Sequence, residues 1–468
     1  MKRMPQKGRG LGMRLAALCA AAVIALGSLT GCATGTAIAD GKGFDDIMAA
    51  LRTDLFGSET QDCRQLSLAL PLRYGFEPVE DKSAYRSLND TVMQSVYQEI
   101  EQSIFRISDE VDEATGYYVM QYTRLPSSLD FDDIYVVKEA VISDHPEAFW
   151  ILGSYDIRNN FHDGNYLVLF SKYSHEQITA AFQEINQATE EILGMIPDGA
   201  GELEREMIIH DALVDSIEYD FDVAESDDAT ADAFNIYGAL VRKKAVCSGY
   251  ACAAKMLLNR VGIQCRTVVG MSKNTGHMWN QVKINGNWYH LDVTWNDSSA
   301  GNDGVLYVRY HYFNLSDELI KKNHTIGKNY SQMVCEYTED GVYTTAELYN
   351  FDLEPCDTLD ANYYEMNAAH ISELGDDAIR SITEKMIDAS KTQEEIIYIL
   401  FDSSVPPEEA EAWLAQDARW QYSTLKQSIN STNNYGIGRR IKTASLWRFS
   451  SDDESVWENL YAVRLFYA

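Results

Sequence analysis

The sequence of 468 residues lacks internal repeats and long low-complexity stretches, and it is poor in positive charge. It has 39 Lys and Arg residues against 71 Asp and Glu residues, so its formal net charge is −32. An acidic excess of this size repels nucleic-acid phosphates and anionic membrane surfaces. We therefore expect no nucleic acid among the partners. An aromatic content of 11% argues against a disordered chain.

The sequence also lacks a disulfide framework. Its eight cysteines are too sparse and too irregularly spaced for one. Cys19 lies in the N-terminal segment described next, and Cys32 ends it. If one of the other six stays reduced for chemistry, at most two bridges can form, and we expect Cys335 with Cys356 first. The six are Cys63, Cys247, Cys252, Cys265, Cys335 and Cys356.

The N-terminus has the pattern of an export signal. Five basic residues and no acidic ones precede an apolar run at 15–30, which is shorter than the ~20 residues that span a bilayer. The run ends in Ser-Leu-Thr-Gly-Cys, which matches a bacterial lipobox. We expect residues 1–31 to be a lipoprotein signal peptide, with an acylated Cys32 anchoring an outward-facing protein to the cell membrane. Secretion after cleavage at Ala39 is the alternative. Removal of the signal leaves a net charge of −37.

The rest of the chain divides into four parts by composition and periodicity. Residues 32–45 are typical of a flexible tether. Residues 46–198 indicate an N-terminal α+β region, 199–335 a core domain, and 340–468 a small C-terminal α+β domain, so the fold class is α+β. Outside the core we predict helices over 85–111, 175–194, 376–390 and 406–429, and strands over 165–170, 362–371, 394–401, 439–449 and 458–468.

A helix is predicted to begin at or near Cys247. Apolar residues recur at helical spacing from Tyr250 to Val261, and Gly262 stands just past the expected end. The unpaired N–H groups and the dipole of a first turn stabilise a thiolate, which lowers a thiol pKa from ~8.5. Cys252 lies about 140° around the helix from Cys247, which argues against a local disulfide or a shared zinc ion.

A β-hairpin is predicted downstream. Asn285-Gly286 is the strongest short hairpin signal, and it joins the strand-like HMWNQVKI to a return strand over 287–295. The two-residue turn sets a register in which His277 and Asp292 are diagonal neighbours on one face, ~7–8 Å apart between backbones. A slip by one residue would separate them. His290 lies on the same face, and we interpret it as a hydrogen-bonded sheet histidine.

Three motifs in this region resemble the transglutaminase-like superfamily in its bacterial secreted branch. They are AVCSGY at 245–250, GHMWN at 276–280 and WYHLDVTWND at 288–297. The flanking DAFNIYGAL and YHYFNLSD fit the same branch, and DHPEAFW at 144–150 resembles the region often found upstream. The resemblance covers about 200–330 and leaves the C-terminal part unexplained.

The resemblance implies a papain-like α+β core, with a cysteine-bearing helix packed on an antiparallel sheet. It makes Cys247 the nucleophile, His277 the general base and acid, and Asp292 the group that orients the imidazole. The backbone N–H of Cys247 would help to hold the oxyanion. Animal members use an upstream tryptophan as a further donor, and no Trp lies between Trp150 and Trp279.

The expected function is that of a thiol enzyme acting on amide bonds through a thioester. A cysteine peptidase, an amidase and a transglutaminase all remain open, with a peptide or protein, including cell-wall peptide, as substrate. The alternative is a non-catalytic surface module that binds peptide or cell-wall polymer in the same cleft. We expect no cofactor and no metal, because a zinc site of Cys247, Cys265 and His277 would lack the paired close spacing of such sites.

Overall fold

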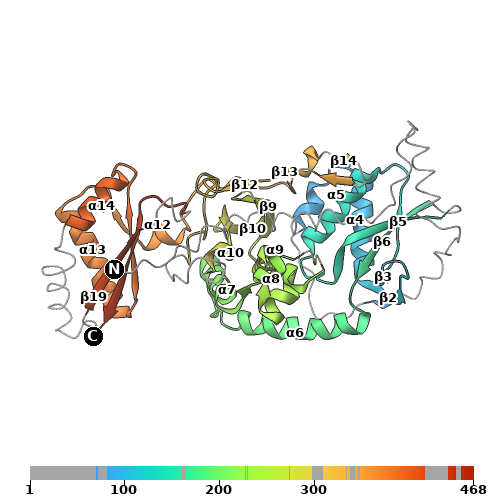
Figure 1. The fold of residues 1–468 in the computed structure, drawn as a ribbon, viewed down its shortest axis with the longest axis horizontal. Coiled ribbons are helices and arrows are strands. Elements are labelled where there is room, and N and C mark those ends of the chain that lie inside the picture. Colours follow the sequence, from blue (N-terminus) through green and yellow to red (C-terminus); the bar gives the residue numbers. More distant parts are fainter. Residues whose placement is uncertain are drawn as a thin grey trace, which may run out of the picture. The chain divides into compact units, whose positions relative to one another are not determined.

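The computed structural model describes residues 70–71, 82–160, 164–226, 228, 230–273, 275–297, 309–333, 335–337, 343–345, 348–416, 441–448 and 455–467. These form two compact units (Figure 1). Unit 1 comprises residues up to 286 together with 324–355, and unit 2 comprises 287–323 together with 356–468. The predicted signal peptide, Cys32 and the tether lie outside the described residues. Helices and strands are mixed in both units, so the predicted α+β class is confirmed.

An antiparallel sheet forms the N-terminal part of unit 1. Its order is β1-β2-β3-β6-β4, and β5 also pairs with β6. The strand predicted at 165–170 is confirmed as part of β6, and the helix predicted over 175–194 is confirmed as α6 (His175–Leu193). The strands are β1 (Leu70–Pro71), β2 (Arg106–Val111), β3 (Tyr118–Met120), β4 (Thr123–Leu125), β5 (Ile151–Asn160) and β6 (Gly164–Ser171).

The single helix predicted over 85–111 is wrong. The chain forms α3 (Ser83–Ser87) and α4 (Thr91–Ile104), and then enters β2. Asp90 separates the two helices, because its carboxylate accepts hydrogen bonds from Val92 N at 2.7 Å and Met93 N at 3.1 Å. This capping geometry starts a new helix, and helical periodicity alone does not reveal it. The next helix is α5 (Phe131–Asp144).

A second sheet in unit 1 carries the segment of the sequence motifs. Strand β9 (Cys265–Ser272) pairs antiparallel with β10 (Thr275–Ile284) and with β12 (His324–Ile326). Helix α9 (Cys247–Arg260) begins at Cys247 as predicted, and Gly262 follows it with a φ of +80°. Helix α7 (Glu202–Ser216) packs beside it, and Arg205 donates to the Val261 carbonyl at 2.7 Å.

Short elements complete unit 1. The acidic segment at 220–232 contains the one-turn α8 (Phe221–Ala224). The others are β7 (Glu218–Tyr219), η2 (Asp232–Phe234), η3 (Gly238–Arg242), β8 (Lys244–Ala245), β13 (Lys328–Asn329), η6 (Tyr330–Gln332), β14 (Cys335–Tyr337), β15 (Tyr343–Thr345) and β16 (Tyr349–Asn350).

Unit 2 opens with a predicted strand that proves shorter than expected. The Asn285-Gly286 turn is confirmed, since its φ angles are +50° and +93°, as a type I′ turn requires. However, β11 (Asn287–Leu291) ends four residues before the predicted Trp295, and α10 (Val293–Asn296) follows. The reason is Asp292, whose side chain caps α10. The predicted pairing of residues beyond Asp292 is therefore wrong.

The C-terminal part of unit 2 is a four-stranded sheet covered by helices (Figure 1). Its order is β17-β18-β20-β19, with β17 parallel and β20 antiparallel to β18. Alternate strand residues such as Ile399 and Val463 share one buried cluster with α13 and α14, while Tyr398 packs on Tyr364 of α12 with ring centroids 4.7 Å apart. The strands are β17 (Ala369–Ile371), β18 (Ile396–Phe401), β19 (Ile441–Arg448) and β20 (Leu460–Tyr467), and the helices are α11 (Asp317–Ile320), α12 (Tyr363–Asn367), α13 (Asp376–Thr392) and α14 (Pro407–Gln416).

Most C-terminal predictions agree with this sheet. The exception is 362–371, where Asn362 caps α12 and only the last three residues form a strand. The part of the predicted helix beyond 416 lies outside the described residues. Within the described ranges, every helix is too short or too polar to cross a bilayer.

Candidate active site

Cys247 is the first residue of α9 and is 4% exposed. The preceding Val246 is extended, with φ −99° and ψ 179°, and has no side chain that could cap the helix. Donors of the first turn are therefore left for another acceptor, and the positive end of the helix dipole acts on the sulfur. Cys247 is a reduced cysteine, as the prediction requires.

The backbone of η2 holds the start of α9 from one side. Val246 donates its N–H to the Ala233 carbonyl at 2.9 Å, and the Ser248 hydroxyl donates to the Phe234 carbonyl at 3.0 Å. Gly249 completes the contact, because a Cβ there would lie 2.5 Å from the Ala233 oxygen. The Cys-Ser-Gly sequence thus has a local reason: the hydroxyl ties the turn and the glycine admits the neighbouring chain.

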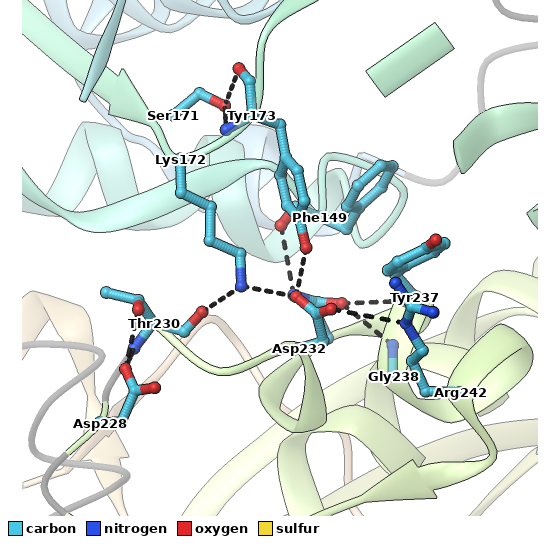
Figure 2. A network of polar contacts seen from close by, with 11 residues as sticks. Phe149, Ser171, Lys172, Tyr173, Asp228, Thr230, Asp232, Tyr237, Gly238 and Arg242 are labelled. Carbon is cyan, nitrogen blue, oxygen red and sulfur yellow. Dashed lines mark hydrogen bonds and ion pairs between the residues drawn. The ribbon is translucent and has the colours of Figure 1, made fainter. Parts of the chain in front are cut away.

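The η2 turn is itself fixed by a polar network around Asp232 (Figure 2). Lys172, just after β6, places its Nζ 2.5 Å from Asp232 Oδ1, and the Tyr173 hydroxyl donates to the same oxygen. Burial, followed by this hydrogen bond, raises the pKa of Tyr173. Gly238 packs on the Asp232 carbonyl, where a Cβ would lie 2.2 Å from the oxygen. Residues from the N-terminal sheet therefore support the turn on which Cys247 rests.

Helix α9 is also tied to the sheet that carries His277. The Asn280 side chain of β10 donates to the Ala251 carbonyl at 3.0 Å and to the Arg266 carbonyl at 3.2 Å. The buried Lys255 donates from α9 to the Ser143 carbonyl. The Asn280 bond makes α9 and β10 parts of one scaffold, and the Lys255 bond ties α9 to α5.

His277 lies in β10 and is 6% exposed. Its ring stacks on Trp279, with centroids 5.8 Å apart and planes 18° apart. Gly270 of β9 faces His277 across the sheet, and a Cβ there would come within 2.8 Å of the Trp279 ring. The glycine therefore makes room for the indole, which packs as a scaffold residue beside the imidazole.

A second histidine, which the sequence reasoning missed, lies beside His277. The His324 ring is buried, with its centroid 5.4 Å from that of His277 and 5.1 Å from that of Trp279. Ring nitrogens of the two histidines lie within 4.8 Å of one another. His324 comes from β12, where it pairs with Ser272. No spacing rule could have found it, because its place depends on the strand pairing of β12 with β9.

Lys273 lies in the turn between β9 and β10, close in sequence to His277. It adopts a left-handed φ of +51°, and burial lowers its pKa to about 8. A lysine in this state loses its charge more easily than an exposed one.

Asp292 is fully buried in unit 2. Its Oδ1 accepts from Trp295 N at 3.1 Å, and its own N–H donates to the Tyr312 carbonyl at 2.9 Å. The carboxylate is thus held at the start of α10. Cys247 and His277 belong to one unit and Asp292 to the other, and the convergence of the three remains a prediction.

The other cysteine and histidine predictions have clear outcomes. His290 is a hydrogen-bonded strand residue as interpreted, with Nε2 2.9 Å from Asp317 Oδ1. Burial lowers the pKa of His290 in spite of that bond. The predicted disulfide between Cys335 and Cys356 is wrong, because Cys356 is reduced. It is buried beside His290 and Asp317.

Comparison with known proteins concerns the same segment. Residues 190–293, which include Cys247, His277 and Asp292, match the profile of the Transglutaminase-like superfamily. Mouse and human kyphoscoliosis peptidase are each 27% identical to the chain over 177 residues, which is 33% of this chain and 26% of each relative. The match thus spans about a quarter of the relatives' length.

A crystal structure of a TGase aligns with 37% of this chain and 50% of its own, at 16% identity and a TM-score of 0.23. By the profile match, the segment that holds the three predicted residues is similar to the Transglutaminase-like superfamily.

Proposed function

We propose that this protein is a thiol enzyme that acts on amide bonds of a peptide or protein through Cys247, His277 and Asp292. The observation that carries the proposal is a reduced cysteine as the first residue of α9, within the segment that matches the Transglutaminase-like superfamily. Motif, helix start and family match coincide at this one position. The buried His277 on the sheet tied to α9 supports it.

The chemistry follows from these groups. The Cys247 thiolate attacks the amide carbonyl, and the C–N bond breaks as His277 gives its proton to the departing amine. The product is a thioester on Cys247. Asp292 would hold the imidazole in the required tautomer and favour its charged form. Backbone N–H groups at the start of α9 would stabilise the oxyanion.

The acceptor for the acyl group decides the reaction class. Water gives a peptidase or amidase, and an amine gives a transglutaminase. The proposal covers both, since they share the thioester step. The protein would work on the outer face of the cell membrane, held by a lipid on Cys32, and the strongly acidic mature chain would rely on this lipid for anchoring.

Selective alkylation of Cys247 is the first test. We expect iodoacetamide at neutral pH to add one label to the full chain within minutes, and intact mass with peptide mapping to place it on Cys247. His277→Ala should slow labelling by at least tenfold, because the imidazole no longer assists the thiolate. Incubation with candidate peptides and an amine should then give cleavage, deamidation or an amine adduct that Cys247→Ala abolishes.

The matched control is Cys265→Ala, which removes another buried, reduced cysteine of unit 1. It should label and react like the parent. If Cys247 is inert while peptide or cell-wall polymer still binds, the protein is a binding module and the enzymatic proposal fails. Anchoring is tested separately by growth with labelled fatty acid, which Cys32→Ala should no longer incorporate.

A further inference from the structure

A second set of cysteine, histidine and aspartate lies in unit 2, away from the motifs. It consists of Cys356, His290 and Asp317, whose sulfur, ring nitrogen and carboxylate oxygen lie within 4.8 Å of one another. Cys356 and His290 are fully buried, and the Asp317 side chain is 31% exposed. The proposed reaction uses none of the three.

We infer that these three side chains form a binding site for one zinc-like divalent metal ion. The donor set selects this class, because a thiolate and an imidazole suit zinc and its soft or borderline neighbours, whereas calcium and magnesium take oxygen ligands. The exposed side of Asp317 leaves a fourth position for water. The inference does not depend on the proposed catalytic function.

The backbones that carry the ligands are cross-tied. His290 N–H donates to the Leu315 carbonyl at 2.8 Å, and Leu315 N–H donates back to the His290 carbonyl at 2.8 Å. Asp317 N–H donates to the Cys356 carbonyl at 2.8 Å. Three segments distant in sequence are thus locked together at the ligands themselves. Such preorganisation lowers the entropic cost of ordering the ligands when a metal ion binds.

The spacing of the donor atoms fits a tetrahedral ion after small shifts. With bonds of about 2.0–2.3 Å, two donors of a tetrahedral zinc ion lie about 3.3–3.8 Å apart. His290 Nε2 and Asp317 Oδ1 are 2.9 Å apart, as in a hydrogen bond. The partly exposed carboxylate can open this distance by turning. Lys321 Nζ, 2.6 Å from Asp317 Oδ2, holds the second oxygen and leaves Oδ1 for the ion.

Protons and charge balance in this site. On metal binding the Cys356 thiol releases its proton to solvent. The neutral His290 imidazole, whose Nε2–H faces the Asp317 carboxylate in the metal-free site, loses that proton to solvent and takes one on Nδ1, so it stays neutral while Nε2 binds the ion. A thiolate, a carboxylate and a divalent ion sum to zero charge. A neutral cluster has a much smaller desolvation cost than an isolated buried ion.

The test is cobalt binding to the full chain. Cobalt(II) should give a thiolate charge-transfer band and the intense visible bands of tetrahedral coordination, at one ion per chain. Zinc should displace it, and one zinc per chain should survive desalting in elemental analysis. Cys356→Ser should abolish the charge-transfer band and weaken binding at least tenfold. The matched controls, Cys265→Ser and Cys247→Ser, should keep the band.

Asp317→Asn is the second variant, because its partly exposed side chain makes misfolding less of a concern than at Cys356. It should keep the native circular dichroism and still lose at least tenfold in cobalt affinity. The inference is overturned if the parent shows no charge-transfer band. It is equally overturned if the band survives Cys356→Ser, or if Cys247→Ser removes it, which would place the ion at the proposed catalytic thiol.

Discussion

Cys247 in unit 1 and Cys356 in unit 2 are both buried and reduced, yet their surroundings differ. Cys247 begins a helix of 14 residues, where backbone donors and the positive end of the helix dipole face the sulfur. Cys356 lies in a segment without helix or strand, beside a histidine and a carboxylate that already hydrogen-bond each other. A helix start suits a nucleophile, whereas converging donor atoms suit a metal ion.

The difference teaches that residue types alone do not define a site. Both sets of residues consist of a cysteine, a histidine and an aspartate, but the local sequence marks only the first set. Cys247 stands in a short motif with its helix and turn signals. His290, Asp317 and Cys356 are 27 and 39 residues apart in sequence, and only the pairing of their backbones brings them together.

The strongest test of this comparison replaces each of the two cysteines in turn and compares the losses of activity. Cys247→Ala should lower amide-bond activity by about a thousandfold or more, because a lost nucleophile leaves only binding and oxyanion contributions. Cys356→Ser should leave activity within about threefold. Steady-state rates with a responsive peptide or amine donor measure both. Equal losses in the two variants would contradict the assignment.

The second prediction concerns the close packing at the start of α9. Gly249→Ala would place a Cβ 2.5 Å from the Ala233 oxygen and 2.8 Å from the Ala245 Cβ, so η2 and the first turn must separate. We expect a loss of about 2–4 kcal/mol in the free energy of unfolding, together with slower alkylation of Cys247. Urea denaturation measures the first and mass spectrometry the second.

Gly201→Ala is the matched control. A Cβ there meets nothing within 4 Å and the backbone φ is −68°, so the stability loss should stay below about 1 kcal/mol. Similar losses at the two glycines would mean that the contact with Ala233 does not hold the helix start.

The third prediction compares the pKa values of two buried histidines. Burial alone would lower the pKa of His145, but hydrogen bonds to Glu101 and Glu147 outweigh it and raise the pKa to about 9. His290 has one carboxylate partner, and burial lowers its pKa. His145 is therefore charged at neutral pH and His290 is neutral.

The folded pKa of His145 lies above the unfolded value of ~6.5. Its stabilising contribution is therefore complete below pH 6.5 and is lost as the pH rises through 9. The full difference is on the order of 3 kcal/mol. We expect the stability of the unit that holds Cys247 to fall between pH 7 and 10, with most of this dependence absent in His145→Gln. Denaturation at a series of pH values measures this dependence. If His145→Gln left it unchanged, the hydrogen bonds of His145 to Glu101 and Glu147 would not be its source.

Local signals in the sequence predicted much of the fold. Asn285-Gly286 gave the correct turn because both positions need positive φ, and Gly262 marked the end of α9 for the same reason. The failures occurred where a polar side chain restarted a helix. Asp90 split a predicted helix and Asp292 ended a predicted strand, since a capping carboxylate competes with periodicity.

For the candidate site, the sequence predicted three residues, and it correctly predicted that a helix begins at Cys247. It could not identify His324 or the network around Asp232, because both depend on contacts between segments about 50 or more residues apart. The predicted bridge between Cys335 and Cys356 failed for a related reason. Cysteine spacing does not reveal that Cys356 is fixed beside Asp317 by a backbone hydrogen bond.

The smallest expected effect concerns His324, and it tests whether a residue outside the three motifs influences the ionisation of His277. Two rings with nitrogens within 4.8 Å cannot both become charged without mutual repulsion, so they should titrate as a coupled pair. In the parent, the rate of Cys247 alkylation should follow a pH profile broader than one ionisation. His324→Gln should give a single step, with the apparent pKa of His277 raised, because a neighbouring positive charge is gone.

The control for this prediction is His370→Gln, since His370 is an exposed histidine of unit 2 whose replacement should leave the profile unchanged. Imidazole NMR signals followed across the same pH range give the His277 titration directly. A broad profile that persists without His324 would assign the second ionisation to another group, and Lys273, whose pKa burial lowers to about 8, would be the next residue to replace.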